Sequence, residues 1–364
     1  MISKKLNIGL IGAGMIGDVH IENIRKDGRA DVTWIAARTE KTLQAKMKKH
    51  HIDNGTLDYH EMLKDDSLDA VIIASPPHTH LVMLKDALAA GKNVMLEKPM
   101  VPNRQVLDAL VAEVEKYSDL LVLECSCRHA RLQPKFRFIK QMIDDGKLGE
   151  VYHIHHNHLM RGTFIEYNPS GTWAHQKKLA GGGPFIDWGM YDLSFHLGVL
   201  NDVPQIKSVR SFTRNGLKHF PDPNFKSDIE EHGAAFLEFD TGLTYYYERG
   251  SGVHAEVPNE TRIYGTKGSV RFAFCSWDSP EVEFFTFDQN GNETTEKLIV
   301  DMSDHTDDNF EHAKHFLDCL INGAEPKMTV QLAAKHLDIL FQILVPNQFI
   351  SCPKGKNNSD REFR

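Results

Sequence analysis

Short apolar runs alternate with segments of helical periodicity over the first third of the chain. Runs typical of buried strands lie at residues 6–11, 32–37, 69–74, 93–96 and 120–124. Apolar residues at helical spacing follow them, at residues 15–24, 39–50, 79–90 and 103–117. Strands that alternate with helices of this length indicate βαβ units, so we expect a parallel sheet in this part of the chain.

The pattern changes after residue 124. A helical segment at 134–145 ends at Gly146, and strand-like runs then predominate, at 151–158, 206–212, 234–239, 244–249, 260–264, 270–274 and 282–287. Turn signals at Asp240–Gly242 and Gly265–Gly268 join consecutive runs, as antiparallel hairpins require. Three further helical segments are predicted, at 185–200, 309–322 and 330–344.

These patterns predict an α/β protein of two domains, which agrees with a length of 364 residues. Residues 1–124 form the parallel domain, and 125–345 form an α+β domain whose open sheet is largely antiparallel. The last helices are expected to pack back on the first domain. Residues 346–364 are polar and predict a loose tail.

Composition narrows the classes of partner and compartment. The net charge of −8 disfavours nucleic acid and anionic membrane, since both attract clustered positive charge. No apolar run approaches the ~18 residues of a membrane span, and no signal-type stretch precedes Gly9. The five cysteines are too scattered for a disulfide framework. We therefore expect a cytoplasmic protein with reduced thiols.

A glycine motif follows the first predicted strand. Gly12, Gly14 and Gly17 form G-x-G-x-x-G where the strand ends and a helix begins, the context in which this motif indicates a Rossmann dinucleotide-binding domain. The three glycines serve the tight turn, the approach of the pyrophosphate, and close packing of helix on strand. The N–H groups of the helix start, at Met15 and Ile16, would face the phosphates.

The end of the second predicted strand bears on the choice of cofactor. An NAD-binding domain usually places a carboxylate about 20 residues after the glycine motif, where it binds the adenosine ribose. This chain has Arg38 and Thr39 there. A guanidinium can pair with a 2′-phosphate. The sequence thus predicts NAD(P)(H) as cofactor and favours NADP, although Arg38 could instead stack on the adenine or face solvent.

Four motifs give the chain a family resemblance over residues 6–345. They are the glycine motif, Ser75-Pro76-Pro-His-Thr-His80, Glu97-Lys98-Pro99, and Gly181-Gly-Gly-Pro-Phe-Ile-Asp187-Trp-Gly-Met-Tyr191. Together they resemble the glucose–fructose oxidoreductase / inositol dehydrogenase / MocA (Gfo/Idh/MocA) oxidoreductases. The resemblance implies an NAD(P)-dependent enzyme acting on CH–OH groups. It also implies cofactor contacts from Ser75, Pro76, His80, Glu97 and Lys98.

The resemblance further implies a catalytic group of Lys98, Asp187 and Tyr191. Lys98 follows a strand of the parallel sheet, and ligands of such sheets bind at the carboxyl ends of strands. Asp187 and Tyr191 lie four residues apart on a predicted helix, so they should share one face. Many family members have histidine where this chain has tyrosine, which places it in the Tyr-type branch.

Tyr191 is predicted to act as the general acid/base. An isolated phenol has a pKa near ~10, and we expect the Lys98 ammonium to lower it. Asp187 would orient the lysine or a substrate hydroxyl. His196, five residues beyond Tyr191, is the rival base.

Histidines recur along one predicted strand, at positions 153, 155, 156 and 158. Each strand face would carry a pair, but we expect no metal site, because the family generally uses no catalytic metal and sheet histidines often pack or line a pocket. Further residues are candidates for contacting the substrate: Arg128, His158, Trp173, His175 and His196. Aromatic and basic groups of this kind would suit a sugar.

The leading hypothesis is an oxidoreductase that acts on a ring hydroxyl or keto group of a sugar or glycoside. A trans-dihydrodiol or aldehyde-type dehydrogenase is the alternative enzyme. A non-catalytic dinucleotide-sensing regulator is the alternative of another class, although such a protein would be expected to lose Lys98 or Tyr191. The open antiparallel sheet predicts a homodimer or homotetramer, because an open sheet must bury its apolar face.

Overall fold

The first sheet of the protein is parallel and six-stranded. The computed structural model describes residues 5–167, 171–217, 220 and 225–345. The strands of this sheet follow the order β3-β2-β1-β4-β5-β6. Their bounds are β1 (Leu6–Ile11), β2 (Ala30–Ala36), β3 (Asn54–Thr56), β4 (Ala70–Ile73), β5 (Asn93–Leu96) and β6 (Val122–Glu124). This is the strand order of the doubly wound dinucleotide-binding fold, and the predicted parallel sheet is confirmed.

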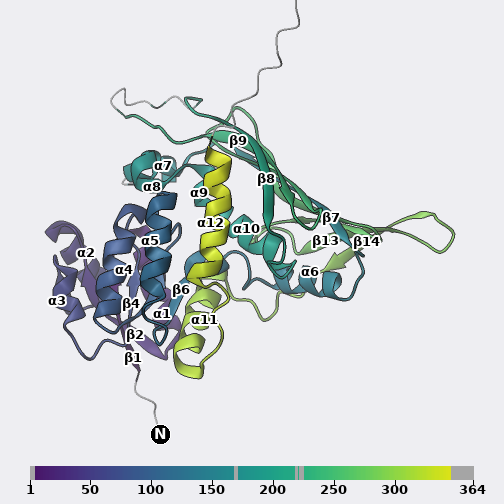
Figure 1. Ribbon diagram of the computed structural model, residues 1–364. Helices are drawn as coiled ribbons and strands as arrows, with labels where there is room; N and C mark the ends of the chain where they lie inside the picture. The colour runs from purple at the N-terminus through teal and green to yellow at the C-terminus, as the bar shows by residue number, and fades with distance from the viewer. Residues whose placement is uncertain (1–4, 168–170, 218–219, 221–224, 346–364) are drawn as a thin grey trace, which may run out of the picture.

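Helices cover this sheet (Figure 1). They are α1 (Met15–Asp27), α2 (Glu40–His50), α3 (Tyr59–Leu63), α4 (His80–Ala89) and α5 (Arg104–Val114). Thr39 and Asn103 cap α2 and α5 through their side chains. All four residues of β4 are buried, since helices pack on both faces of such a strand.

The second sheet has eight strands in the order β14-β13-β12-β11-β7-β10-β9-β8. The bounds are β7 (Val151–Met160), β8 (Ile206–Arg214), β9 (His232–Phe239), β10 (Thr244–Ser251), β11 (Val257–Gly265), β12 (Ser269–Ala273), β13 (Glu281–Phe287) and β14 (Glu293–Ile299). Every pair is antiparallel except β7 with β10. The predicted fold class, α/β with a largely antiparallel second sheet, is therefore confirmed.

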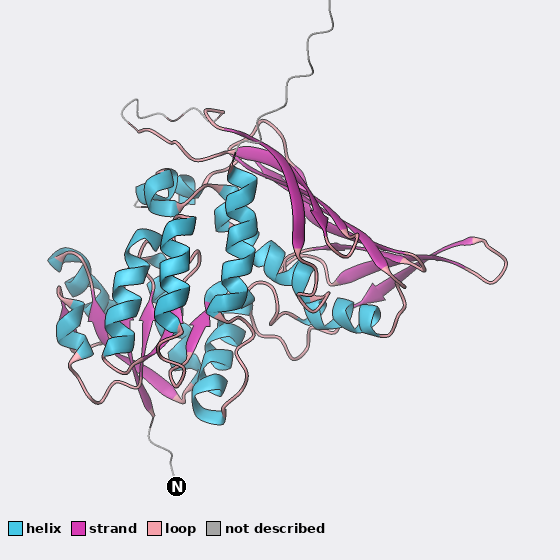
Figure 2. Cartoon of the chain, viewed as in Figure 1, coloured by secondary structure: helices cyan, strands magenta, loops and turns pink. Residues whose placement is uncertain are grey.

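Helices lie along one face of this second sheet, and its other face is open (Figure 2). The helices of this half are α6 (Pro134–Asp144), α9 (Pro184–Asp187), α10 (Gly189–Gly198), α11 (Asp308–Asn322) and α12 (Val330–Leu344). Shorter helical turns are η1 (Pro77–Thr79), η2 (Cys125–Cys127), α7 (Phe164–Tyr167), η3 (Thr172–His175) and α8 (Lys177–Ala180). α12 contacts both α5 and α10, whereas α11 packs on α1.

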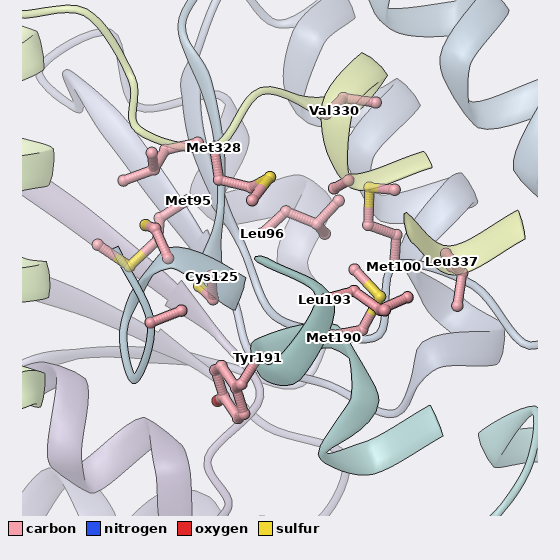
Figure 3. Packing of buried hydrophobic residues seen from close by; sticks show 14 of the residues in the cluster. Met95, Leu96, Met100, Cys125, Met190, Tyr191, Leu193, Met328, Val330 and Leu337 are labelled. Carbon is pink, nitrogen blue, oxygen red and sulfur yellow. The ribbon is translucent and has the colours of Figure 1, made fainter. Parts of the chain in front are cut away.

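One continuous core joins the two halves. Met100, just after β5, lies near Met190 and Leu193 of α10, and Met95 and Leu96 of β5 belong to the same buried cluster (Figure 3). Leu337 of α12 belongs to the same buried cluster. Because interiors of this kind are close-packed, the end of β5 and the start of α10 are held in a fixed relation. Those two segments carry the predicted catalytic residues.

Some element predictions were wrong. The helix expected over 185–200 is two helices, α9 and α10, that meet at Trp188. The close approach of α10 to α12 accounts for Gly189, where a Cβ would lie 2.6 Å from a methyl carbon of Leu340. Strand β14 was missed because its residues are almost all exposed and polar, so they show no alternation. The predicted loose tail, 346–364, lies outside the described residues.

Within the described part of the chain, no helix has the length and apolar character needed to cross a membrane.

Candidate active site

The glycine motif forms a cradle between β1 and α1. Gly12 has a φ of 108°, and a Cβ there would lie 2.6 Å from the Ala74 carbonyl oxygen. A Cβ on Gly17 would lie 2.6 Å from the Gly12 oxygen, so this glycine permits the packing of helix on strand. At Gly14 a Cβ would meet no atom within 4 Å, and no side chain caps the helix there. The open space at this helix start fits a dinucleotide pyrophosphate.

The ribose end of the cradle is exposed. Arg38 follows β2, and its side chain faces solvent. Burial, together with the charge of Arg38, lowers the pKa of His78. The Thr39 hydroxyl accepts a hydrogen bond from the Thr42 N–H at 3.3 Å and so caps α2. Arg38 is therefore the residue of this pair whose polar atoms are open to a ligand.

The loop after β4 is held by a buried histidine. His80 is fully buried; one ring nitrogen lies 2.7 Å from the Ser75 carbonyl oxygen and the other 3.1 Å from that of Met100. The expectation that His80 contacts the cofactor is corrected, because its ring ties together the loops after β4 and β5. Ser75 and Pro76 are half-buried on the same loop, with the Ser75 Oγ 2.7 Å from the Thr79 hydroxyl.

Lys98, Asp187 and Tyr191 meet at the end of β5. The Lys98 ammonium donates to the Asp187 carboxylate at 2.5 Å and to the Asp187 carbonyl at 2.7 Å. It also lies 4.8 Å from the centre of the Tyr191 ring. Burial alone would lower the pKa of Lys98, but the charges of Asp187 and Tyr191 outweigh it and raise that pKa. Lys98 is therefore positively charged at neutral pH.

The glycine loop before Asp187 positions this residue beside Lys98. A Cβ on Gly181 would lie 3.1 Å from the backbone of Pro102, and a Cβ on Gly183 would collide with the Glu230 carbonyl oxygen. The Glu230 carboxylate in turn accepts hydrogen bonds from the N–H groups of Gly183 at 2.8 Å and Phe185 at 3.2 Å. Burial, opposed by these bonds, raises the pKa of Glu230 to about 7. The loop can therefore pass closely between the two halves of the protein.

Tyr191 is almost completely buried. Its side chain is 2% exposed, and its hydroxyl accepts a hydrogen bond from Arg128 Nη2 at 2.5 Å. Burial raises the pKa of Tyr191, and the nearby charges of Arg128 and Lys98 only partly oppose this. The predicted lowering of this pKa was wrong, because burial outweighs the ammonium. Asp187 and Tyr191 do not share an exposed helix face either, because the Asp187 side chain is 42% exposed whereas that of Tyr191 is buried.

Arg128 and Glu97 belong to this buried network. Arg128 Nη1 donates to the Glu97 carboxylate at 2.6 Å, and His20 Nε2 lies 2.8 Å from the same oxygen. Arg128 is 4% exposed, and its guanidinium binds Tyr191 and Glu97; its predicted contact with the substrate stays a prediction. Glu97 is likewise turned to protein partners, whereas the sequence suggested a cofactor contact.

A pocket opens beside the Lys98–Asp187 pair. Trp173 and His175, both predicted substrate contacts, contribute to its wall. His175 Nδ1 lies 3.2 Å from the Ser227 hydroxyl, and its buried Nε2 has no hydrogen-bond partner within the described chain. Other lining residues were missed, among them Phe164, Trp188, Glu230 and Arg249. They come from loops and strand ends far apart in the sequence, and no local pattern marks them.

The remaining histidine candidates lie elsewhere. His196 is fully buried between the Tyr245 hydroxyl at 2.8 Å and the Thr261 hydroxyl at 3.0 Å, so it can be neither the rival base nor a substrate contact. His158 does not line the pocket, and burial beside Arg249 lowers its pKa to about 4.

One group of potential metal ligands, His20, Glu97 and Cys125, occurs in the described part of the chain, and it does not involve the histidines of β7. The Arg128 guanidinium already donates to the Glu97 oxygen of that group. A bound cation at the same oxygen would face this positive charge.

Both halves of the chain match a family of known proteins. Residues 6–124 match the model described as oxidoreductase family, NAD-binding Rossmann fold, and residues 136–271 match the GFO/IDH/MocA C-terminal domain. D-xylose 1-dehydrogenase [NADP(+)] of Haloarcula marismortui is 26% identical over 272 residues, which are 74% of this chain and 69% of that protein. Trans-1,2-dihydrobenzene-1,2-diol dehydrogenase of Xenopus laevis is 27% identical over 315 residues, 84% of this chain and 86% of that protein.

The fold is also that of a solved dehydrogenase. The structure of levoglucosan dehydrogenase in complex with NADH and levoglucosan superposes with a TM-score of 0.80 at 18% identity, over 94% of this chain and 97% of that chain. The similarity spans both sheets, so the arrangement of a parallel sheet beside an open antiparallel sheet is shared.

Proposed function

The chain belongs to the GFO/IDH/MocA oxidoreductase family, and we propose that it transfers a hydride between NAD(P) and a ring hydroxyl or keto group of a sugar or glycoside. The observation that best supports this proposal is the Lys98–Asp187 pair. It lies at the end of β5 and lines a pocket with aromatic walls. The sugar and diol substrates named for the relatives support this substrate class.

Different residues of the chain would carry out different parts of the reaction. A bound nicotinamide supplies the hydride acceptor in the oxidative direction. Lys98, held by Asp187, donates a hydrogen bond to the substrate oxygen and stabilises negative charge that develops there. The Tyr191 hydroxyl exchanges the proton of that oxygen. Trp173 and His175 orient the ring, the first by stacking and the second by a hydrogen bond from or to its unpartnered Nε2.

A substrate panel tests this function. Purified protein is mixed with NAD or NADP and with pentoses, hexoses, anhydrosugars, inositols and trans-dihydrodiols, and absorbance of the reduced nicotinamide is followed. Turnover of a sugar with kcat/KM well above that of the diols supports the proposal. Preference for the diols would instead select the alternative dehydrogenase, and binding of dinucleotide with no turnover of any alcohol would select the regulator.

Arg38 predicts the cofactor preference. Because an exposed Arg38 follows β2 where NAD-binding domains usually place a carboxylate, we expect NADP to bind at least as tightly as NAD. Arg38→Ala should weaken NADP binding by about tenfold, the equivalent of one charge-assisted contact, and leave NAD nearly unchanged. Fluorescence titration of both dinucleotides measures this, with Lys48→Ala on the exposed side of α2 as the matched control. A clear NAD preference in the unaltered protein would refute the argument.

The open face of the second sheet predicts self-association. Phe236, Tyr246, His155 and Arg262 are cross-strand neighbours there, on β9, β10, β7 and β11. The Phe236 side chain is 41% exposed. An exposed band of aromatic and charged groups of this kind is typical of subunit contacts, so we propose a dimer or a tetramer built from dimers.

Light scattering tests this assembly. The unaltered protein should be dimeric or larger at micromolar concentration, and Phe236→Glu should shift it toward monomer. Val82→Glu on α4, also at an exposed apolar residue, is the control that should leave the assembly intact. A monomeric unaltered protein would contradict the proposal.

A further inference from the structure

A histidine–carboxylate pair stands beside the catalytic group. His129 follows η2, and its Nδ1 lies 2.7 Å from the Asp308 carboxylate. Asp308 is the first residue of α11 and is buried; its second oxygen lies 2.8 Å from His305 Nε2. Burial alone would raise the pKa of Asp308, but its bonds to His129 and His305 hold that pKa well below the usual range. Asp308 is thus a buried carboxylate.

This pairing fixes the tautomer of His129. A carboxylate only accepts hydrogen bonds, so the proton of a neutral His129 ring lies on Nδ1 and the lone pair on Nε2. Nε2 has no hydrogen-bond partner among the described residues, and the side chain is 15% exposed. A base needs this combination: one nitrogen oriented by a carboxylate and the other free to accept a proton.

Its surroundings place His129 at the site. The ring meets the Tyr191 ring edge-on with centroids 4.8 Å apart, and it stacks at 6.0 Å on Trp188, which lines the pocket. Charged and titratable groups around it are Asp308 and His305 on the α11 side, Arg128 on its own segment, and Lys98 and Tyr191 opposite. Burial and the charges of Arg128 and Lys98 outweigh Asp308 and lower the pKa of His129. Its ring is therefore neutral at pH 7.

Tyr191 by itself cannot complete the oxidation. Its pKa is raised, so at neutral pH the phenol carries its own proton and can accept the substrate's proton only while it releases its own. Arg128, which donates to the Tyr191 oxygen, has only N–H donors and cannot take that proton. Another group near Tyr191 must therefore accept the proton that the phenol releases.

We propose that His129, oriented by Asp308, is that acceptor and passes the proton to solvent. This inference rests on the proposed function. In the oxidative direction the C–H bond breaks with its electron pair, which reduces the nicotinamide, and the substrate O–H proton moves to the Tyr191 oxygen. The phenol's original proton passes to Nε2 of His129, giving an imidazolium paired with Asp308. The imidazolium then releases its Nε2 proton to bulk water, and in the reductive direction it supplies that proton.

His129→Asn tests the inference. The asparagine amide can still donate to Asp308 but cannot accept a proton. We expect kcat for oxidation to fall by about 10²–10³-fold, within the range of general acid–base catalysis, with little change in dinucleotide binding. The unaltered enzyme should lose activity as the pH falls through the pKa of His129, because only the neutral ring accepts, and His129→Asn should lack this acidic limb. Added imidazole should restore part of the rate to His129→Gly.

Two further measurements separate this role from a structural one. Ring ¹⁵N shifts should show His129 neutral at pH 7 with its proton on Nδ1, and Asp308→Asn should move the acidic limb to lower pH, because the imidazolium loses its counter-charge. His60→Asn is the matched control, since His60 forms a similar pair with Asp58 at 2.6 Å on the surface. It should leave the rate and the limb unchanged.

The outcomes are distinguishable. An active wild type whose His129→Asn variant folds, keeps more than about a third of kcat and keeps the acidic limb would overturn this inference alone. Shifts showing Nε2 protonated at pH 7 would overturn it as well. A wild type that oxidises no sugar or diol would overturn the proposed function, and this inference with it.

Discussion

Lys98→Met is expected to lower kcat by about 10²–10⁴-fold or more and to leave dinucleotide binding nearly intact. The ammonium of Lys98 is the only cation that both lines the pocket and contacts the Asp187 carboxylate, as far as the described residues show. Methionine keeps the length and the apolar stem but removes the charge. The substrate oxygen then loses its donor at the moment when negative charge develops on it.

Single-turnover measurements with saturating dinucleotide would show this loss directly. The change should fall on kcat, since an interaction made mainly in the transition state does little for KM. Lys98→Arg is the informative partner variant, because it keeps a cation in a bulkier, planar form. The Asp187 side chain is 42% exposed, so solvent can stabilise it when Lys98 is lost and the variant should remain folded. A Lys98→Met variant with more than about a third of wild-type kcat would exclude Lys98 from the chemistry.

The sequence was most informative where a motif sits at a fixed place in a local pattern. Gly12, Gly14 and Gly17 predicted the cradle because each glycine serves a steric need that spacing alone defines. Lys98 could be placed at a strand end for the same reason. The meeting of Lys98 with Asp187, 89 residues away, came from the family resemblance and not from periodicity.

The partners of each side chain were much less predictable. Nothing local shows that Arg128 reaches Tyr191, 63 residues away, or that His129 reaches Asp308, 179 residues away. These contacts depend on how α10 and α11 pack, and that packing is determined by residues throughout the buried core. The direction of the Tyr191 pKa was missed for a related reason. Charges can be counted in a sequence, whereas the burial that outweighs them here cannot.

Tyr191→Phe should lower kcat by about 10²–10⁴-fold with nearly unchanged dinucleotide binding, because it removes only the hydroxyl that exchanges the substrate proton. The phenyl ring keeps its contacts with Lys98, His129 and Trp188. Arg128 Nη2 loses its partner in a buried site, at a cost of about 1–3 kcal/mol, so thermal unfolding must be measured beside the kinetics. A folded variant that keeps more than about a third of kcat would exclude Tyr191 as the proton-exchanging group.

The double variant Tyr191→Phe/His129→Asn decides whether the two residues act in one proton path. Groups that act as a unit are strongly non-additive, so the double variant should be about as slow as the slower single variant. Independent groups would instead multiply their losses. The pH profile adds a second criterion. Since the raised pKa of Tyr191 keeps the phenol protonated, the acidic limb of wild-type oxidation should report His129 rather than Tyr191. If the acidic limb disappears in Tyr191→Phe but persists in His129→Asn, the group that titrates is the phenol. That result would contradict the proposed proton transfer from Tyr191 to His129.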